Sequence, residues 1–159
     1  MASHDLRSAY ATYPGAKDEW KDFRPAQPGN WVDWVPPASV KTVEGFARVV
    51  DGDTVVVNGT RVRLKGVDAP ELSHPSGNEA KLALQGIIGP SLTCQLTGER
   101  THDREVGWCY NIFGSDIGAA IILAGKALAC PHYDRRYVAL EQPDAIARLP
   151  RASYCRARG

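Results

Sequence analysis

A β-hairpin pattern near the middle of the chain constrains the fold more than any other feature. Residues 49–71 read VVDGDTVVVNGTRVRLKGVDAPE, in which Asn58-Gly59 separates two apolar runs. This dipeptide favours the tight two-residue turn that joins antiparallel strands. Another strand pattern, VEGFARVV, starts at Val43, directly before the hairpin. We therefore expect three strands that follow one another closely along the chain.

The pattern changes to helical spacing after Pro75. The apolar positions that share one face of this expected helix are Ala80, Leu84, Ile87 and Ile88. Two more strand patterns follow, SLTCQLTG and VGWCYNIF. Ser115 or Asp116 can then cap a second helix, and a third is expected within residues 138–149, beginning near Pro143.

These elements predict an α+β protein that is mainly β, a five-stranded antiparallel barrel of the OB type with about three helices. An α+β sheet with three helices would give a similar order of elements, so the strand count alone leaves both architectures open. Residues 1–42 are rich in Pro and Trp and show no sustained periodicity, which predicts an irregular arm. Residues 43–159 form the predicted domain.

Composition and charge exclude several classes of protein. A chain of 159 residues with 43% hydrophobic residues can bury a core as one domain and is not of the disordered class. The net charge is only +1, so any binding of anions must be local. No run approaches the roughly 20 apolar residues that span a bilayer, and the N-terminus lacks the apolar stretch of a signal peptide. We expect a soluble monomer without a membrane partner.

The cysteines bear on the cellular compartment. Cys94, Cys109, Cys130 and Cys155 include no C-x-x-C pair, which argues against a structural zinc site or a thioredoxin-like motif. Four cysteines permit two disulfides in three pairings, and Cys94 and Cys109 lie on consecutive strand patterns that can bring them together. Buried thiols in a cytoplasmic protein are the alternative. We expect disulfides and a secreted or periplasmic protein.

Carboxylates gather around the ends of the central strand patterns. Asp51 belongs to a turn sequence with Gly52, and turn chemistry alone explains it, but not Asp68 and Glu71 farther on. Carboxylate oxygens without nearby thiolate or imidazole suit hard cations such as calcium and magnesium. An EF-hand is excluded because the segment that starts at Asp51 lacks the oxygen side chains such a loop needs.

Two motifs together resemble the staphylococcal nuclease family: VVDGDTV and, after it, RLKGVDAPE. The downstream order, including DIGAAIILAGKALA, is also similar, and the resemblance covers residues 43–149, about two thirds of the chain. It implies a five-stranded OB barrel that uses calcium to hydrolyse DNA and RNA, with water attack in line with the 5′ oxygen and 3′-phosphate products. Residues 1–42 and 150–159 have no counterpart in the family pattern.

The resemblance also implies roles for individual residues. Asp53 and Asp68 match the metal-binding carboxylates, the backbone carbonyl of Ala69 takes the place of another oxygen ligand, and Asp51 matches an acid close to the metal that orients the site. Glu71 matches the glutamate that activates the attacking water. This fits phosphodiester hydrolysis, which needs a positioned water and neutralisation of charge on the phosphoryl oxygens.

Two arginines match the pair that neutralises this charge. Arg63 has the family spacing from the metal-binding motif. Arg104 lies in ERTHDREVGWCY, where the family commonly reads D-R/K-Y-G-R, so two alignments compete. We prefer Arg104 as the closing arginine because the following strand then continues without a gap; the alternative places Gly107 on that position. This choice puts His102 where the family has tyrosine.

Tyr133 matches one of two tyrosines that line the family's nucleotide pocket, and Pro131 replaces the other. We expect Tyr133 and His102 to contact the substrate. The sequence thus predicts a calcium-dependent nuclease that acts on DNA and RNA with little base specificity. Two alternatives stay open: a nuclease-like module that binds nucleic acid or a protein without cleaving, and a form inhibited by the arm of residues 1–42.

Overall fold

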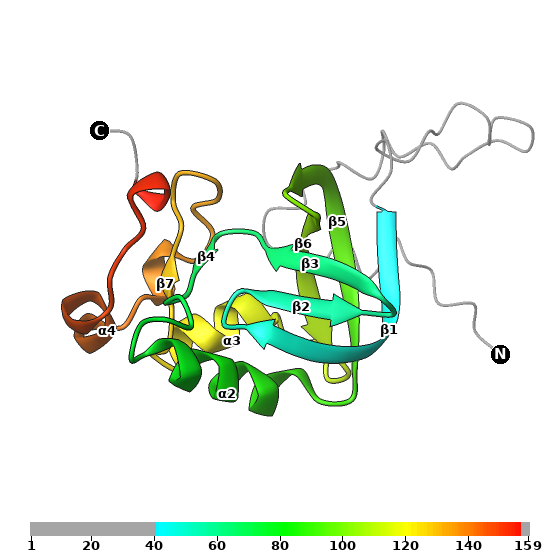
Figure 1. Cartoon of the computed structure of the whole chain (residues 1–159), viewed down its shortest axis with the longest axis horizontal. Coiled ribbons are helices and arrows are strands. Elements are labelled where there is room, and N and C mark those ends of the chain that lie inside the picture. The colour runs from blue at the N-terminus through cyan, green and yellow to red at the C-terminus, as the bar shows by residue number, and fades with distance from the viewer. Residues whose placement is uncertain (1–40, 157–159) are drawn as a thin grey trace, which may run out of the picture. The chain divides into compact units, whose positions relative to one another are not determined.

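The computed structural model describes residues 41–156 (Figure 1). The predicted arm therefore lies outside the described residues, apart from Lys41 and Thr42, which already belong to the first strand, β1. Within residues 41–156, the protein is a mixed α+β fold that is mostly sheet, as the sequence predicted. None of the helices in this part combines the length and apolarity that a membrane span requires.

Five strands join into one sheet that closes on itself in the order β1-β2-β3-β6-β5. Their bounds are Lys41–Asp51 for β1, Thr54–Val57 for β2, Thr60–Leu64 for β3, Ser91–Thr101 for β5 and Arg104–Asn111 for β6. The predicted hairpin between β2 and β3 is confirmed, since Asn58 and Gly59 both have positive φ angles, 48° and 80°. This is the conformation that a two-residue turn of this kind requires.

One pairing of the barrel is parallel, so the expectation of a wholly antiparallel barrel is wrong. Strand β3 runs alongside β6 in the same direction, with Val62 opposite Glu105 and Leu64 opposite Gly107. The other four pairings are antiparallel. A closed ring of five strands cannot alternate in direction throughout, because five is odd, and at least one neighbouring pair must be parallel.

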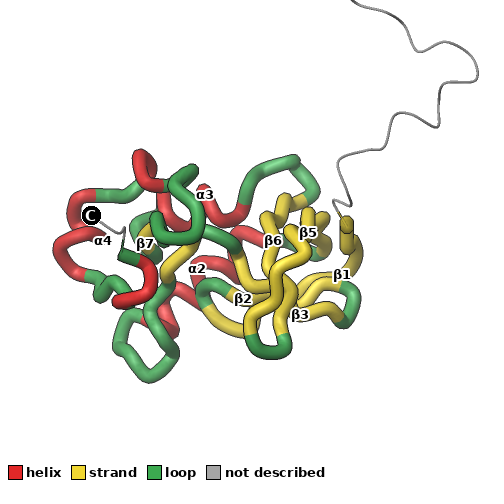
Figure 2. The backbone as a smooth tube through the Cα atoms, turned by 90° about the horizontal axis from the view of Figure 1, so that it is seen from above, coloured by secondary structure: helices red, strands yellow, loops and turns green. Residues whose placement is uncertain are grey.

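The helices lie to one side of the barrel (Figure 2). Helix α2 spans Gly77–Ile88, α3 spans Ile117–Leu123 and α4 spans Pro143–Arg148. Asp116 caps α3 by accepting hydrogen bonds from two backbone N–H groups. The predicted third helix is divided: a 3-10 turn, η2, covers Val138–Leu140, and α4 starts at Pro143, which suits the first position of a helix.

A second, two-stranded sheet was not predicted. It pairs β4, Val67–Asp68, with β7, Leu128–Ala129, in antiparallel register. Each strand has only two residues, too short to show a pattern in the sequence. The pairing joins the segment after the barrel's β3 to the segment that leads towards the C-terminal part of the chain (Figure 1).

The core fills the barrel and the space between it and helices α2 and α3. The fully buried members include Val55, Val62, Leu84 and Ile121. The two expected disulfides are present. Cys94 and Cys109 face each other across β5 and β6 in the core, whereas the second disulfide joins Cys130, which follows β7, to Cys155 in the C-terminal 3-10 turn η3, Ser153–Cys155.

Candidate active site

The acidic turn between β1 and β2 is held by its own side chains. Asp51 Oδ1 accepts a hydrogen bond from the backbone N–H of Asp53 at 3.1 Å, and the Thr54 hydroxyl donates to Asp53 Oδ1 at 2.9 Å. Gly52 lies so close to Ala69 that a Cβ added there would approach the Ala69 Cβ to 2.7 Å. The turn therefore lies against the segment that carries the predicted carbonyl ligand.

Three neighbouring strands bring both predicted arginines to Asp53. Arg63 on β3 pairs with Thr54 on β2, and Arg104 opens β6, which is the parallel neighbour of β3. Arg63 Nη2 lies 3.3 Å from Asp53 Oδ2, and Arg104 Nη1 lies 3.9 Å from Asp53 Oδ1. Arg104 Nη1 also donates to the Thr54 hydroxyl at 2.9 Å. Gly107, the competing position, lies farther along β6, where a Cβ would approach the carbonyl oxygen of Gln95.

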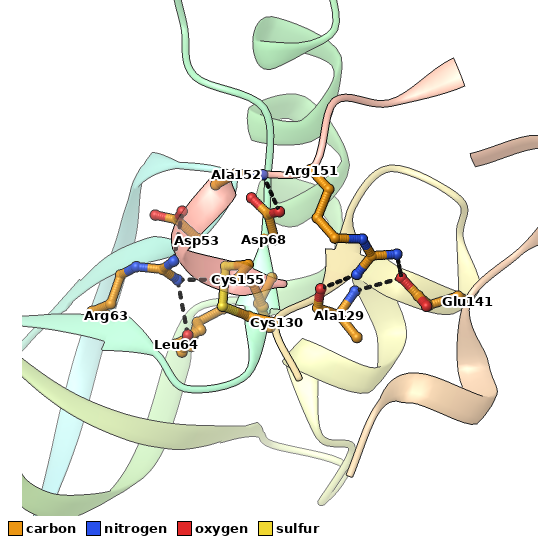
Figure 3. Close-up of a disulfide and its surroundings, with 11 residues drawn as sticks. Asp53, Arg63, Leu64, Asp68, Ala129, Cys130, Glu141, Arg151, Ala152 and Cys155 are labelled. Atoms are coloured by element: carbon orange, nitrogen blue, oxygen red, sulfur yellow. Dashed lines mark hydrogen bonds and ion pairs between the residues drawn. A yellow bond between two sulfur atoms is a disulfide. The ribbon is translucent and has the colours of Figure 1, made fainter. Parts of the chain in front are cut away.

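Backbone carbonyls hold the guanidinium of Arg63 in place. Its Nη1 donates to the carbonyl oxygens of Leu64 and Val67, both at 2.9 Å, while Nη2 faces Asp53 (Figure 3). The side chain is only 12% exposed. Because the guanidinium is already fixed, the side chain loses little conformational entropy when it binds an anion.

Both predicted metal-binding carboxylates lie in environments that disfavour their charge. Burial raises the pKa of Asp53 to about 7, although the charge of Arg63 acts in the opposite direction. Burial likewise raises the pKa of Asp68, partly offset by the hydrogen bond that its Oδ2 accepts from the Ala152 backbone N–H at 2.8 Å and by the charge of Arg63. The charge of Glu71 also acts on Asp68 and adds to this rise, so the three acids and Arg63 form one electrostatic group.

A cavity of about 540 Å³ lies beside this group. It brings together five of the predicted site residues, which are Arg63, Glu71, His102, Arg104 and Tyr133. Asp53 and Asp68 are not part of its wall. Asp53 instead contacts Arg63 and Arg104, and these two arginines are part of the cavity wall.

Sequence reasoning missed five polar or aromatic residues of the cavity wall: Lys65, Glu99, Arg100, Thr101 and Tyr154. Lys65 pairs with Glu99 at 2.6 Å, and Arg100 pairs with Glu105 at 3.2 Å, so acids partly balance both charges. Arg100 belongs to β5, outside the two family motifs, whereas Lys65 lies within the second motif, RLKGVDAPE, although no role was predicted for it. Tyr154 lies in the part of the chain without a family counterpart, and its only sequence signal is the adjacent Cys155.

The predicted oxygen donors suit a hard cation by their chemistry. They comprise the carboxylates of Asp53 and Asp68 and the carbonyl of Ala69, and calcium and magnesium prefer such ligands. Burial disfavours the negative charge of both carboxylates, and a cation bound between them would stabilise that charge. In residues 41–156, no group of three or more His, Cys, Asp or Glu side chains is placed to hold a metal.

Comparison with known proteins supports the resemblance to nucleases. No family model matches the chain. The succinoglycan biosynthesis protein ExoI of Rhizobium meliloti (strain 1021) is 31% identical over 102 residues, which cover 57% of this chain and 53% of that protein. Two proteins of Oryza sativa subsp. japonica, named probable staphylococcal-like nucleases CAN1 and CAN2, are 35% and 34% identical over 88 and 87 residues.

The similar region covers about half of this chain in each comparison. It makes up 26% and 23% of the two rice proteins, so the chain spans about half, or less, of the length of the curated relatives it matches. The resemblance indicated by the two sequence motifs is confirmed at this modest identity: the chain is similar to the staphylococcal-like nucleases.

Proposed function

We propose that this protein is a metal-dependent nuclease that hydrolyses phosphodiester bonds of DNA and RNA without discriminating between the two sugars. The observation that carries the proposal is the cavity whose wall joins Arg63, Arg104 and Glu71. Two guanidinium groups and one exposed carboxylate on a single wall meet the needs of phosphodiester hydrolysis, which are charge neutralisation and activation of water. The names of the rice relatives support the same reaction class.

In the proposed reaction, the arginines bind the non-bridging oxygens of the scissile phosphate. Glu71 orients a water molecule and accepts its proton as the oxygen attacks phosphorus. The bond between phosphorus and the 5′ oxygen breaks, the leaving oxygen takes up a proton, and the products carry a 3′-phosphate and a 5′-hydroxyl. A guanidinium can donate two parallel hydrogen bonds to a phosphate, which favours arginine over lysine in this role.

We propose calcium as the metal, bound by Asp53, Asp68 and the carbonyl oxygen of Ala69, with Asp51 orienting Asp53 through its backbone. When bound, the cation supplies positive charge next to the phosphate. Asp53 has two kinds of positive partner available in this proposal, the metal and the arginines. With a cation bound, Asp53 would no longer need Arg63 as its counter-charge, and Arg63 Nη2 would be available to the substrate.

The closed five-stranded sheet supports assignment to the OB type, in which α2 connects β3 to β5. The two disulfides support an oxidising compartment, in line with a secreted or periplasmic protein.

A digestion assay tests the reaction itself. Plasmid DNA and a structureless RNA are incubated with the purified protein in calcium or in EDTA, and the ends of the products are analysed. We expect cleavage of both nucleic acids in calcium, none in EDTA, and 3′-phosphate ends. Binding of both substrates without cleavage in any divalent metal would instead support a non-catalytic binding module.

A further inference from the structure

Two large aromatic side chains on the cavity wall remain half exposed. Tyr133 is 53% exposed and Tyr154 is 51% exposed, and both line the same cavity as Arg63 and Arg104. Packing in the core therefore does not account for either ring. Tyr133 follows β7, whereas Tyr154 belongs to η3 near the C-terminus, so two separate segments of the chain place an aromatic ring on this wall.

Several interactions hold the C-terminal segment, residues 151–155, against the site. The Cys130–Cys155 disulfide joins it to the segment that carries Tyr133, and the N–H of His132 donates to the carbonyl oxygen of Cys155 at 3.3 Å. Both bonds involve residues adjacent to the two tyrosines or close to them. They fix where Tyr154 stands relative to the cavity.

Arg151 and Ala152 anchor the start of the same segment (Figure 3). Arg151 donates to Glu141 Oε2 at 2.6 Å and to the carbonyl oxygen of Ala129 at 2.7 Å. The Ala152 N–H donates to Asp68 Oδ2 at 2.8 Å. The segment is thus fixed at both ends, and one of its contacts is a proposed metal ligand.

We propose that the C-terminal segment is part of the substrate site and that Tyr154 stacks with an unpaired nucleobase, alongside Tyr133. This inference rests on the proposed nuclease function and names a substrate preference within it. Pro131 replaces the second tyrosine of the family pattern, so the loop after β7 supplies only one of the two tyrosine rings. Tyr154 adds a second ring from a different segment, and the Cys130–Cys155 disulfide holds it there.

Stacking on Tyr154 and Tyr133 favours some forms of nucleic acid over others. Aromatic side chains stack on base faces, and in a duplex both faces of an internal base are already covered by its neighbours. Single strands, loops and frayed ends expose these faces. The protein should therefore bind and cleave single-stranded substrates more readily than duplexes, and Tyr154 should contribute to this difference.

The first test compares steady-state constants of Tyr154 variants on a fluorogenic oligothymidylate and on a duplex of similar length. Loss of one stacking ring typically weakens binding of a base by about 5- to 150-fold. We expect Tyr154→Ala to raise KM for the single strand by on the order of tenfold while kcat changes little, with a smaller effect on the duplex. Tyr154→Phe keeps the ring and should behave as the parent.

The matched control is Phe113→Ala, which removes an aromatic ring that is 85% exposed and outside the cavity wall. It should leave both constants unchanged. Equal KM values for Tyr154→Ala and the parent would overturn the inference, as would a Tyr154→Phe variant that behaves like Tyr154→Ala.

The second test concerns the disulfide as the positioning element. Cys130→Ser with Cys155→Ser should raise KM for the single strand in the same direction as Tyr154→Ala. Adding Tyr154→Ala to this variant should then raise KM little further, because the ring has already lost its position. Full additivity of the two effects would contradict a role of the disulfide in placing Tyr154.

Binding of a labelled oligothymidylate in EDTA separates this inference from the proposed function. If the parent binds the probe in EDTA but cleaves no nucleic acid in calcium, and Tyr154→Ala weakens this binding, the nuclease proposal fails while the role of Tyr154 stands. If the parent cleaves and Tyr154→Ala neither binds nor cleaves differently, the inference fails and the nuclease proposal stands.

Discussion

Asp53 shows how one side chain can link the proposed metal site to the proposed phosphate site. It lies between Arg63 and Arg104, is hydrogen-bonded by Thr54, and has a pKa raised by burial. Its charge can attract either a cation or a guanidinium. These contacts hold Arg63 and Arg104 in place before the proposed phosphate group binds.

The metal proposal can be tested at Asp53 by calcium titration, independently of activity. Asp53→Asn keeps the size of the side chain and its ability to accept from Thr54, but it removes the negative charge that binds a cation. We expect calcium affinity to fall by at least about tenfold with little change in the melting temperature. Asp103→Asn, at a side chain that is 71% exposed and pairs with Arg61, is the control and should bind calcium as the parent does. Equal affinity of all three proteins would refute the assignment.

Arg104 tests the alignment that the sequence left open. Arg104→Lys retains a positive charge but loses the planar fork that binds two phosphate oxygens. We expect kcat to drop by about 100-fold, the usual effect of losing one donor to a developing charge. Arg61→Lys, on β3 but outside the cavity wall, serves as the matched control. An Arg104→Lys enzyme as fast as the control would place the second catalytic arginine elsewhere.

At the scale of elements, the sequence predicted the helices and hairpins that depend on residues close together in the chain. The β2–β3 hairpin follows from Asn58-Gly59, and α2 follows from apolar residues at helical spacing. The parallel β3–β6 pair and the β4–β7 pair could not be predicted, because they join residues far apart in the chain and the strands of the second pair have only two residues each. Local patterns do not specify such partners.

The same limit applies to the candidate site. Residues within the two motifs, such as Asp53 and Glu71, could be proposed because the motifs resemble those of the nuclease family and because carboxylates suit the implied roles. Tyr154 could not, since its place beside the cavity depends on a disulfide whose pairing the sequence left open. The preference for Arg104 rested on the length of a strand, and the structure places this residue against Asp53.

Replacement by alanine should have opposite effects on stability at two glycines, one in the acidic turn and one in α2. A Cβ at Gly52 would lie 2.7 Å from the Ala69 Cβ and 2.8 Å from the Ala80 Cβ, so Gly52→Ala should destabilise the protein by roughly 1–3 kcal/mol. Gly86, inside α2, has nothing within 4 Å of an added Cβ. Gly86→Ala should stabilise by about 0.5–1 kcal/mol. Urea unfolding measures both, and a Gly52→Ala protein as stable as the parent would disprove the close approach.

At the scale of the whole molecule, the two disulfides stabilise different parts of the structure. Cys94–Cys109 lies in the barrel core, and Cys130–Cys155 ties the C-terminal segment to the loop that follows β7. One supports the scaffold and the other, in our proposal, supports the substrate site. Both should be needed for stability, because each restricts the unfolded chain.

Burial predicts how these disulfides respond to a reductant. All four cysteines are at most 1% exposed, so a reductant can attack them only when the structure opens. The folded protein should yield no titratable thiols after brief exposure to dithiothreitol at 25 °C. The same treatment in denaturant should yield four. Rapid release of two thiols from the folded protein would show that one disulfide is accessible and that its surroundings open readily.

Glu71→Gln tests the central claim most directly. Initial rates of oligonucleotide cleavage in calcium are compared for the parent, for this variant and for Glu79→Gln, an exposed carboxylate on α2 outside the cavity wall. The amide of glutamine cannot accept the proton of the attacking water, so we expect kcat to fall by about 100-fold or more, while Glu79→Gln cleaves at the parent rate. A Glu71→Gln protein that cleaves as fast as the parent would contradict the proposed reaction.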